Sequence, residues 1–330
     1  MKILITGATG FIGAHLLVKL FREGKKIRAT YRNARNFEEL KMIAAYHGIK
    51  FGELFSAVEW VKVDLLDAVA LDRAMWDISE VYHCAAVVSF HSGSAETLLR
   101  TNVEGTRNIV KACLRKEIGK LCYISSIGAL NGTNGEGFTD EDCFEEPAGG
   151  SVYSRSKHLS EKEVWDGIEQ GLQAVILNPG IVLGYGDLRK GSLQFFDSVR
   201  NGLLFYTAGV TGYVDVRDVC RAAFECMEAN RFNRRFLLVS ENLSYQQLLI
   251  LIARAYGKRA PFIKASKPLL NAALFFSSLK TRITGKPQRF TRETLRSSVK
   301  KTYYLCENTR AELGFEFIPI AETVQDIVAH

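Results

Sequence analysis

The chain has 330 residues, of which 47% are hydrophobic and 24% are charged, and its formal net charge is +7. These values describe a globular protein that can bury a substantial core, and they exclude a disordered or fibrous chain. The basic residues form no long run, so nucleic-acid binding is not expected, although a basic balance would suit an anionic ligand or a membrane surface.

The chain begins with a short apolar strand, Ile3 to Ile5, and a helical run follows from His15 to Phe21. Between them lies Thr6-Gly7-Ala8-Thr9-Gly10-Phe11-Ile12-Gly13, with the spacing Gly-x-x-Gly-x-x-Gly. Glycine serves where a backbone bends sharply or touches a phosphate, and the first N–H groups of a helix attract an anion. The segment predicts a dinucleotide-binding turn, although such glycines can also merely connect a strand to a helix.

Strand-like runs then alternate with helical runs over about two thirds of the chain. This alternation predicts an α/β fold with a doubly wound parallel sheet, and near-continuous apolar strands fit a sheet covered on both faces. The predicted strands are Lys25–Tyr31, Val58–Val63, Val81–Ala86, Lys120–Ser125, Ala174–Leu177 and Arg235–Val239, and the predicted helices are Ala70–Met75, Glu96–Lys116 and Ser154–Glu169.

The alternation of strand-like and helical runs ends after Asn178-Pro179-Gly180. We therefore expect residues 1–179 and 213–240 to form a nucleotide-binding domain. Residues 180–212, which are rich in glycine and aromatic side chains, and residues 241–330, which look mostly helical, are expected to form a smaller substrate lobe.

Tyr153 and Lys157 are four residues apart, a spacing that places both on one face of a helix. A phenol titrates near about 10, and a neighbouring ammonium group favours the phenolate and lowers that pKa. The pair can therefore exchange a proton, although the spacing alone is common. Ser125 and Ser126 end an apolar strand, where a hydroxyl can hold a carbonyl oxygen.

These segments together resemble the extended branch of the short-chain dehydrogenase/reductase superfamily, the NAD-dependent epimerase/dehydratase family. The resemblance covers residues 1 to about 240 and continues more weakly to the end. The motifs that carry it are Thr6-Gly7-x-x-Gly10-x-x-Gly13, Asp64-Leu65, His83-Cys84-Ala85-Ala86, Asn102-Val103-x-Gly105-Thr106, Ser125-Ser126, Tyr153-x-x-x-Lys157, Asn178-Pro179-Gly180 and Tyr213-Val214-Asp215-Val216-x-Asp218-Val219.

The resemblance implies a Rossmann-type fold and a role for each motif. Tyr153 would donate or accept the proton, Lys157 would lower its pKa and bind the nicotinamide ribose, and Ser126 would orient the carbonyl, with adjacent Ser125 as the alternative. Asn102 would support a proton relay through a water to Lys157, or be solvated or cap a break in its helix. The residues expected at the coenzyme are Gly7, Thr9, Gly10, Phe11, Ile12, Gly13, Tyr31, Arg32, Asp64, Leu65, Ala85, Ala86, Asn102, Tyr153, Lys157, Asn178, Pro179 and Gly180.

Several of these residues could instead have a purely structural role. Asp64, expected at the adenine, could only cap a strand end, and Ala85 and Ala86 could be small core residues. His83 is interpreted as a packed strand-end residue rather than a base. The residues expected to touch substrate are Val88, Ser126, Tyr153 and Ile181.

The residues at the end of the second predicted strand indicate which coenzyme is preferred. NAD enzymes of this type place an acidic residue there, whereas this chain has Tyr31-Arg32-Asn33-Ala34-Arg35. Arg32 can pair with a 2′-phosphate, which a carboxylate would repel, so NADP(H) is preferred and NAD(H) remains possible. As an alternative, Arg32 is a solvated loop charge.

The resemblance is strongest to dihydroflavonol-reductase-like and 3β-hydroxysteroid-dehydrogenase-like enzymes, which implies NADPH-dependent reduction of an apolar ketone or aldehyde. The basic residue that sugar-nucleotide enzymes have before the Tyr213 motif is absent, since Thr211-Gly212 stands there. The alternatives are a nucleotide-sugar epimerase or dehydratase with retained NAD(P), and a non-catalytic NADP(H)-sensing regulator.

Seven cysteines without a Cys-x-x-Cys pair predict a cytoplasmic protein without a metal site. The first apolar segment is a strand and turn rather than a signal peptide. Pro268 to Leu279 is too short to span a bilayer, and packing is favoured over membrane contact. The family resemblance implies a homodimer built from helices near Asn102–Arg115 and Tyr153–Trp165.

Overall fold

The computed structural model describes residues 1–88, 95–130, 137–139, 151–266, 268–270, 274, 292–314 and 316–330. Most of the segment Pro268 to Leu279, for which packing was favoured over membrane contact, lies outside the described residues. Among the helices that are described, none has both the length and the apolar composition that a membrane span requires.

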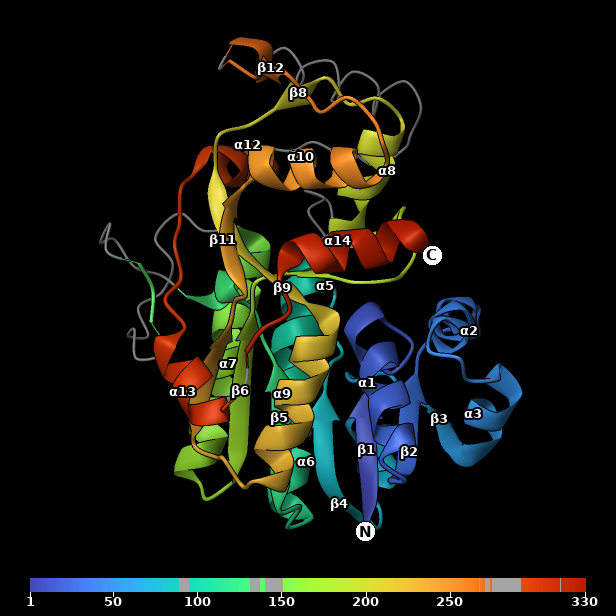
Figure 1. Cartoon of the computed structure of the whole chain (residues 1–330). Helices are drawn as coiled ribbons and strands as arrows, with labels where there is room; N and C mark the ends of the chain where they lie inside the picture. Colours follow the sequence, from blue (N-terminus) through green and yellow to red (C-terminus); the bar gives the residue numbers. More distant parts are fainter. Residues whose placement is uncertain are drawn as a thin grey trace.

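A seven-stranded sheet forms the centre of the molecule (Figure 1). Its strand order is β10-β6-β5-β4-β1-β2-β3, and every pair of neighbours is parallel. The order reverses between β1 and β4, which is where open sheets of this kind bind ligands. The predicted doubly wound parallel sheet is confirmed. Its strands are β1 (Lys2–Thr6), β2 (Lys26–Tyr31), β3 (Val58–Lys62), β4 (Ile78–His83), β5 (Lys120–Ile124), β6 (Ala174–Pro179) and β10 (Arg234–Leu238).

Helices cover both faces of this sheet, because its strands alternate side chains between two apolar cores. Ile3 and Ile5 of β1 belong to the core under α1 (Phe11–Arg22), α2 (Phe37–Tyr46) and α9 (Val216–Glu228). Leu4 belongs to the opposite core. That core lies under α4 (Ala68–Ala74), α6 (Gly105–Arg115) and α7 (Val152–Glu169), while α3 (Phe51–Ala57) follows α2 at the edge.

The predicted helix Glu96–Lys116 consists of three segments. It comprises α5 (Ala95–Leu99), a π-helical turn over Arg100–Glu104, and α6. Single π-helical turns often occur at functional positions, and this one contains Asn102.

The second part of the chain builds two small sheets and its own apolar core. β7 (Ile181–Leu183), β9 (Val210–Asp215) and β11 (Glu241–Ser244) form one sheet, and β8 (Phe205–Tyr206) pairs with β12 (Ile263–Lys264). The core contains Phe196, Tyr213, Leu248, Ile252 and Ile320, among others. The described helices of this part are α8 (Gln194–Arg200), α10 (Tyr245–Ala255), α12 (Arg292–Val299), α13 (Glu307–Leu313) and α14 (Ile320–Ala329), with a short 3-10 turn over Gly191–Leu193. Two further 3-10 turns, Ala34–Asn36 and Ile127–Ala129, lie in the first part of the chain.

Two details of the second part differ from expectation. The region after residue 240 is largely helical, as expected, but it also contains the short strands β11 and β12. Residues 213–240 were expected in the nucleotide-binding domain, yet of their strands only β10 belongs to the seven-stranded sheet. β9 joins β7 instead, because Gly180 and Gly212 let the two backbones approach closely. A Cβ on Gly180 would lie 2.6 Å from the Gly212 carbonyl oxygen. The exact limits of the two lobes stay a prediction.

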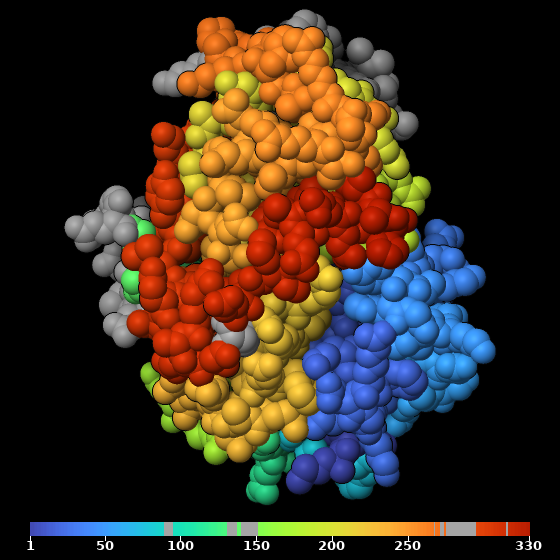
Figure 2. Space-filling model, viewed as in Figure 1, coloured from blue at the N-terminus to red at the C-terminus, as the bar shows by residue number. Residues whose placement is uncertain are grey.

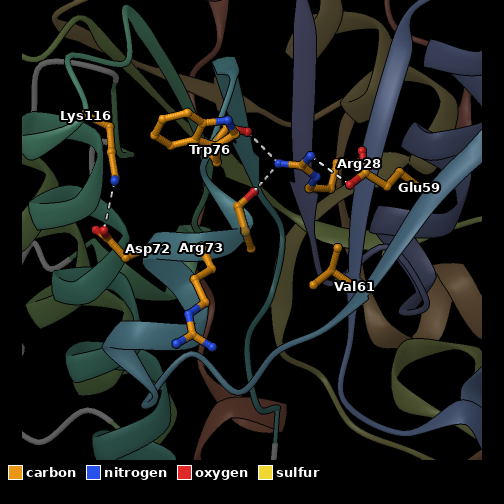
Figure 3. A pocket seen from close by; sticks show the side chains of 8 residues that line it. Arg28, Glu59, Val61, Asp72, Arg73, Trp76 and Lys116 are labelled. Carbon is orange, nitrogen blue, oxygen red and sulfur yellow. Dashed lines mark hydrogen bonds and ion pairs between the residues drawn. The ribbon is translucent and has the colours of Figure 1, made fainter.

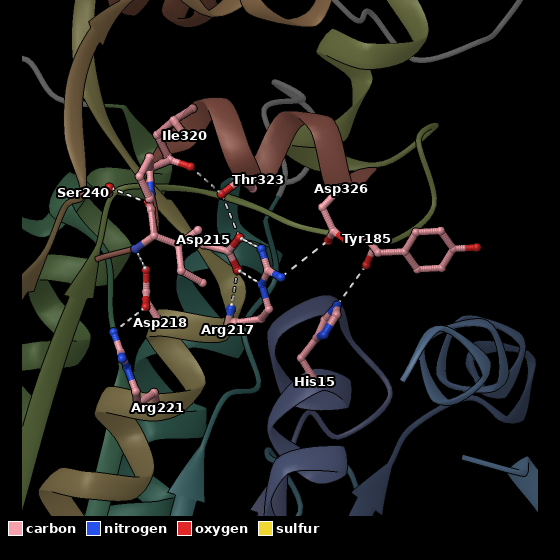
Figure 4. Close-up of polar contacts among 12 residues, drawn as sticks. His15, Tyr185, Asp215, Arg217, Asp218, Arg221, Ser240, Ile320, Thr323 and Asp326 are labelled. Carbon is pink, nitrogen blue, oxygen red and sulfur yellow. Dashed lines mark hydrogen bonds and ion pairs between the residues drawn. The ribbon is translucent and has the colours of Figure 1, made fainter. Parts of the chain in front are cut away.

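Polar contacts of the Tyr213 motif hold the C-terminal helix α14 in place (Figure 4). Asp215 caps α9 and accepts hydrogen bonds from the Arg217 backbone N–H at 2.7 Å and from the Thr323 hydroxyl of α14 at 2.7 Å. Asp218 accepts a bond from the Ile318 N–H at 2.7 Å. In Figure 2 the red C-terminal residues accordingly lie between the orange region of α10 and the yellow helix α9.

We expect Thr323→Val to lower the free energy of unfolding by about 1.5 kcal/mol or more, because it removes a buried hydrogen bond to a carboxylate. Urea denaturation measures this change, and Thr323→Ser, which keeps the hydroxyl, is the matched control. Equal stability of the Val and Ser variants would contradict the assigned contact.

Candidate active site

The turn between β1 and α1 has no space for side chains at two of its glycines. Gly7 has a φ of +71°, and a Cβ on it would lie 2.6 Å from the Ala85 backbone nitrogen. A Cβ on Gly13 would lie 2.1 Å from the Gly7 carbonyl oxygen. The turn therefore packs directly against the end of β4 and against the first turn of α1.

The start of α1 is suited to an anion. Gly10 is its exposed N-cap residue and supplies no side-chain hydrogen bond, and the first turn of the helix has no acidic residue. The first N–H groups of a helix have no partner within it, so they remain for a ligand phosphate. Phe11 and Ile12 are half-buried and Thr9 is buried. This glycine cradle fits the pyrophosphate of a dinucleotide.

The strands β2 and β3 end in residues that the sequence assigned to the adenosine half of the coenzyme. Tyr31 ends β2 with its ring against Phe37, and Arg32 follows as an exposed side chain with no partner among the described residues. Asp64 is exposed after β3 and accepts a hydrogen bond from the Leu66 N–H at 3.0 Å. Leu65 is buried.

The segment after β4 is fixed by Asn102. The Asn102 side chain accepts a bond from the Val87 N–H at 2.7 Å and donates to the Val87 carbonyl at 3.0 Å and to Ser156 Oγ at 3.0 Å. Both amide hydrogens are thus used within the protein. Asn102 shapes the backbone beside Ala85 and Ala86, so its side chain is neither solvated nor a cap, and its part in a proton relay stays a prediction.

His83 packs at the end of β4, as expected. Its ring nitrogens lie 2.7 Å from Thr6 Oγ1 and 3.1 Å from Thr106 Oγ1, and burial lowers its pKa to about 3. The ring is therefore neutral and joins β1 to α6, which leaves it no role as a base.

The two serines after β5 face different surroundings. Ser125 is buried, and its hydroxyl donates to the Glu161 carboxylate at 2.5 Å. Ser126 is half-buried, and its hydroxyl shares a hydrogen bond with the Tyr153 hydroxyl. Of the two alternatives, the geometry brings Ser126 to Tyr153.

Tyr153 and Lys157 lie on the first turns of α7, which Ser151 caps through the Ser154 N–H. Burial raises the pKa of Tyr153 to about 12, opposite to the lowering that was expected from Lys157. The Lys157 ammonium group instead donates to the Ile124 carbonyl at 2.9 Å and contacts the Tyr123 hydroxyl at 3.4 Å. Burial lowers the pKa of Lys157 to about 8.

Asn178 closes the site behind Ser126. Its Nδ2 donates to the Ser126 carbonyl at 2.9 Å and to Glu161 at 2.5 Å, while Oδ1 is buried and has no hydrogen-bond partner in the described part of the chain. Pro179 ends β6, and Gly180 leads into β7. Of the residues assigned to substrate, Ile181 is half-buried beside Tyr213 and Val88 is 57% exposed.

Sequence reasoning missed Glu161 and Arg235. The Arg235 Nη2 atom lies 2.8 Å from Glu161 Oε2, and their side chains are 6% and 1% exposed. The available signal was the spacing, since Glu161 follows Lys157 by one helical turn on the face that carries Tyr153.

A surface hollow lies near the amino ends of β2 and β3, away from these residues (Figure 3). Four of its charged residues are paired within the protein: Arg28 with Glu59 at 2.7 Å, and Lys116 with Asp72 at 3.0 Å. None of the residues expected at the coenzyme or substrate lines it. Among the described residues there is also no group of three or more side chains suited to hold a metal ion.

Comparisons with known proteins agree with one another on the family that this chain resembles. The model of the NAD dependent epimerase/dehydratase family matches residues 3–238. Sterol demethylase protein B of Methylococcus capsulatus is 30% identical over 79% of this chain and 76% of that protein. A putative dihydroflavonol 4-reductase of Synechocystis is 27% identical over 98% of this chain and 92% of that protein.

Solved structures agree on the fold. The crystal structure of gox2253 has a TM-score of 0.80 with 27% identity, covering 99% of this chain and 97% of that chain. UDP-glucose 4-epimerase of Thermotoga maritima has a TM-score of 0.76 over 100% of this chain and 98% of that chain. At 21% identity, this second likeness shows the fold alone.

We expect Gly13→Ala to destabilise the protein by about 2 kcal/mol or more, because the new methyl group would meet the Gly7 carbonyl oxygen. Gly52→Ala in α3 is the matched control, since a Cβ there has open space and φ is not positive. Urea denaturation measures both changes. Equal stability of the two variants would contradict the close packing described for the turn.

Proposed function

The chain belongs to the NAD dependent epimerase/dehydratase family, and from this premise we propose that it reduces the ketone or aldehyde group of an apolar small molecule with NADPH. The observation that carries the proposal is the meeting of Ser126 and Tyr153 at the carboxyl edge of the sheet, with Tyr153 on the helix that carries Lys157 one turn later. The relatives matched over most of this chain include a putative dihydroflavonol 4-reductase and a cinnamoyl-CoA reductase from Petunia hybrida, which favours a reductase.

The coenzyme would lie along the carboxyl edge of the sheet, where the strand order reverses between the neighbours β1 and β4. The first turn of α1 would hold the pyrophosphate, Asp64 and Leu65 the adenine, and Ala85 and Ala86 the inner side of the cleft. Lys157 would bind the nicotinamide ribose, and Asn178-Pro179-Gly180 would border the nicotinamide. When bound, NADPH supplies the hydride for the reduction.

The substrate carbonyl would sit between Ser126 and Tyr153. As negative charge develops on the carbonyl oxygen, the Ser126 and Tyr153 hydroxyls donate hydrogen bonds to it, and Tyr153 transfers its proton. A pKa of about 12 keeps Tyr153 protonated at neutral pH, as an acid for the reductive direction must be. A positive charge on Lys157 then stabilises the phenolate that the transfer leaves behind.

A preference for NADPH over NADH is part of the proposal. Arg32 is exposed at the end of β2 without a partner among the described residues, and no acidic residue stands beside it. Localisation in the cytoplasm and a homodimer built by α6 and α7 remain predictions from the sequence.

We expect Tyr153→Phe to reduce kcat at least about 10²-fold while leaving the Kd for NADPH nearly unchanged, because the phenyl ring has no proton to give. NADPH oxidation against a panel of aromatic, steroidal and aliphatic carbonyl compounds measures kcat, and fluorescence titration measures Kd. Tyr303→Phe, at an exposed position, is the control. Full activity of Tyr153→Phe would refute the mechanism.

The wild-type assay also separates the alternatives. Stoichiometric NADPH oxidation with a simple carbonyl compound supports the reductase. Conversion of a sugar nucleotide without net coenzyme consumption would instead indicate an epimerase or dehydratase, and NADP(H) binding without any turnover would indicate a regulator.

We expect Arg32→Asp to weaken NADPH binding about tenfold to a hundredfold relative to NADH, because a charge-assisted bond to the 2′-phosphate is lost. Lys26→Asp makes the same charge change at the amino end of β2 and serves as the control. An unchanged ratio of the two dissociation constants in Arg32→Asp would show that Arg32 does not read the phosphate.

A further inference from the structure

Behind the proposed catalytic residues lies a buried carboxylate, Glu161, that the mechanism above does not use. Its side chain is 1% exposed, and it is paired with the buried guanidinium group of Arg235 at 2.8 Å. The other carboxylate oxygen accepts hydrogen bonds from Ser125 Oγ and Asn178 Nδ2, each at 2.5 Å. A buried ion pair of this kind is weak evidence for stability, so its contacts call for a functional explanation.

The contacts of Glu161 lead to Ser126 along two routes. Ser125, which Glu161 holds by its hydroxyl, is the neighbour of Ser126 in the chain. Asn178, which Glu161 also holds, donates from the same Nδ2 atom to the Ser126 carbonyl at 2.9 Å. Glu161 thus fixes the backbone on both sides of the Ser126 side chain, whose hydroxyl meets Tyr153.

Glu161 also acts on Lys157, one helical turn earlier on α7. Burial lowers the pKa of Lys157, and the negative charge of Glu161 opposes that effect. The other titratable or charged groups around Lys157 and Glu161 are Tyr153 one turn earlier on α7 and Arg235 of β10, which pairs with Glu161. Near Lys157 there are also Tyr123 of β5, at 3.4 Å, and Cys84 and His83 at the end of β4. Burial raises the pKa of the Tyr123 and Cys84 side chains and lowers that of His83, so all three are uncharged at neutral pH.

We propose that Glu161 is a positioning residue for the carbonyl reduction. It aligns Ser126 through Ser125 and Asn178, and it supplies the buried negative charge that keeps Lys157 protonated. Arg235 holds the Glu161 carboxylate in place from β10. This inference rests on the proposed function for its catalytic meaning, but the link between Glu161 and Lys157 is a property of the protein alone.

The test compares Glu161→Gln with the double variant Glu161→Gln/Arg235→Gln. The double variant removes the carboxylate without leaving a buried guanidinium group unpaired, so it carries the test where the single variant fails to fold. Arg235→Gln alone keeps the carboxylate. Asp166→Asn is the control, because Asp166 lies on the same helix in an exposed pair with Lys162.

The first measurement is the titration of Lys157 by NMR in lysine-labelled protein without coenzyme, with Lys157→Met to assign the signal. We expect the Lys157 pKa to fall by about one unit in both Glu161→Gln proteins. It should stay at or above the wild-type value in Arg235→Gln and remain unchanged in Asp166→Asn. Titration of Lys157 at the wild-type pH in the double variant would overturn the proposal.

The second measurement is the pH profile of kcat/KM for NADPH-dependent reduction. In both Glu161→Gln proteins, the alkaline limb of the profile should move to lower pH by about one unit, as the Lys157 pKa does. The Kd for NADPH at pH 6.5 should stay within about twofold of the wild-type value. A purely structural carboxylate would give a wild-type profile in the double variant. If the wild-type protein reduces no carbonyl compound, the proposed function fails, while the NMR titration still decides the inference.

Discussion

The contact between the first glycine turn and the end of β4 is the constraint on which the rest of the site depends. A Cβ on Gly7 would meet the Ala85 backbone nitrogen, and a Cβ on Gly13 would lie 2.1 Å from the Gly7 carbonyl oxygen. This packing places the first turn of α1, which has no side-chain cap, at the edge of the sheet where the strand order reverses. The position of the turn therefore fixes where the adenosine half and the nicotinamide half of the proposed coenzyme would lie along this edge.

At the catalytic end, polar side chains rather than apolar packing determine the geometry. Asn102 holds the backbone at Val87, and Glu161 holds Ser125 and Asn178. These groups are buried and can reach few other partners, so each has a strong preference for one arrangement. The Ser126 and Tyr153 hydroxyls meet as a consequence, and burial keeps the Tyr153 hydroxyl protonated at neutral pH.

Much of this was predictable from the sequence, since the parallel sheet follows from the alternation of apolar strands and helices. Tyr153 and Lys157 were singled out because several motifs in the right order resemble one family, while their spacing alone is common. The roles of buried polar groups were not predictable in the same way. Whether Asn102 holds a water or a backbone, and whether Ser125 or Ser126 faces Tyr153, depends on partners far away in the chain. Arg235 lies 74 residues from Glu161, and no local pattern joins them. The pairing of β9 with β7 likewise depends on Gly180 and Gly212, which are distant in sequence.

In the proposed reaction, hydride would pass from NADPH to a carbonyl carbon at this site. The most decisive experiment is reduction with NADPH labelled with deuterium at C4 on one face and, separately, on the other face, followed by mass spectrometry of the product alcohol. We predict one deuterium on the carbinol carbon for each NADPH oxidised with one of the two labelled stereoisomers, and none with the other. Product without deuterium from both stereoisomers, or substrate converted while the labelled NADPH persists, would contradict the proposed reaction.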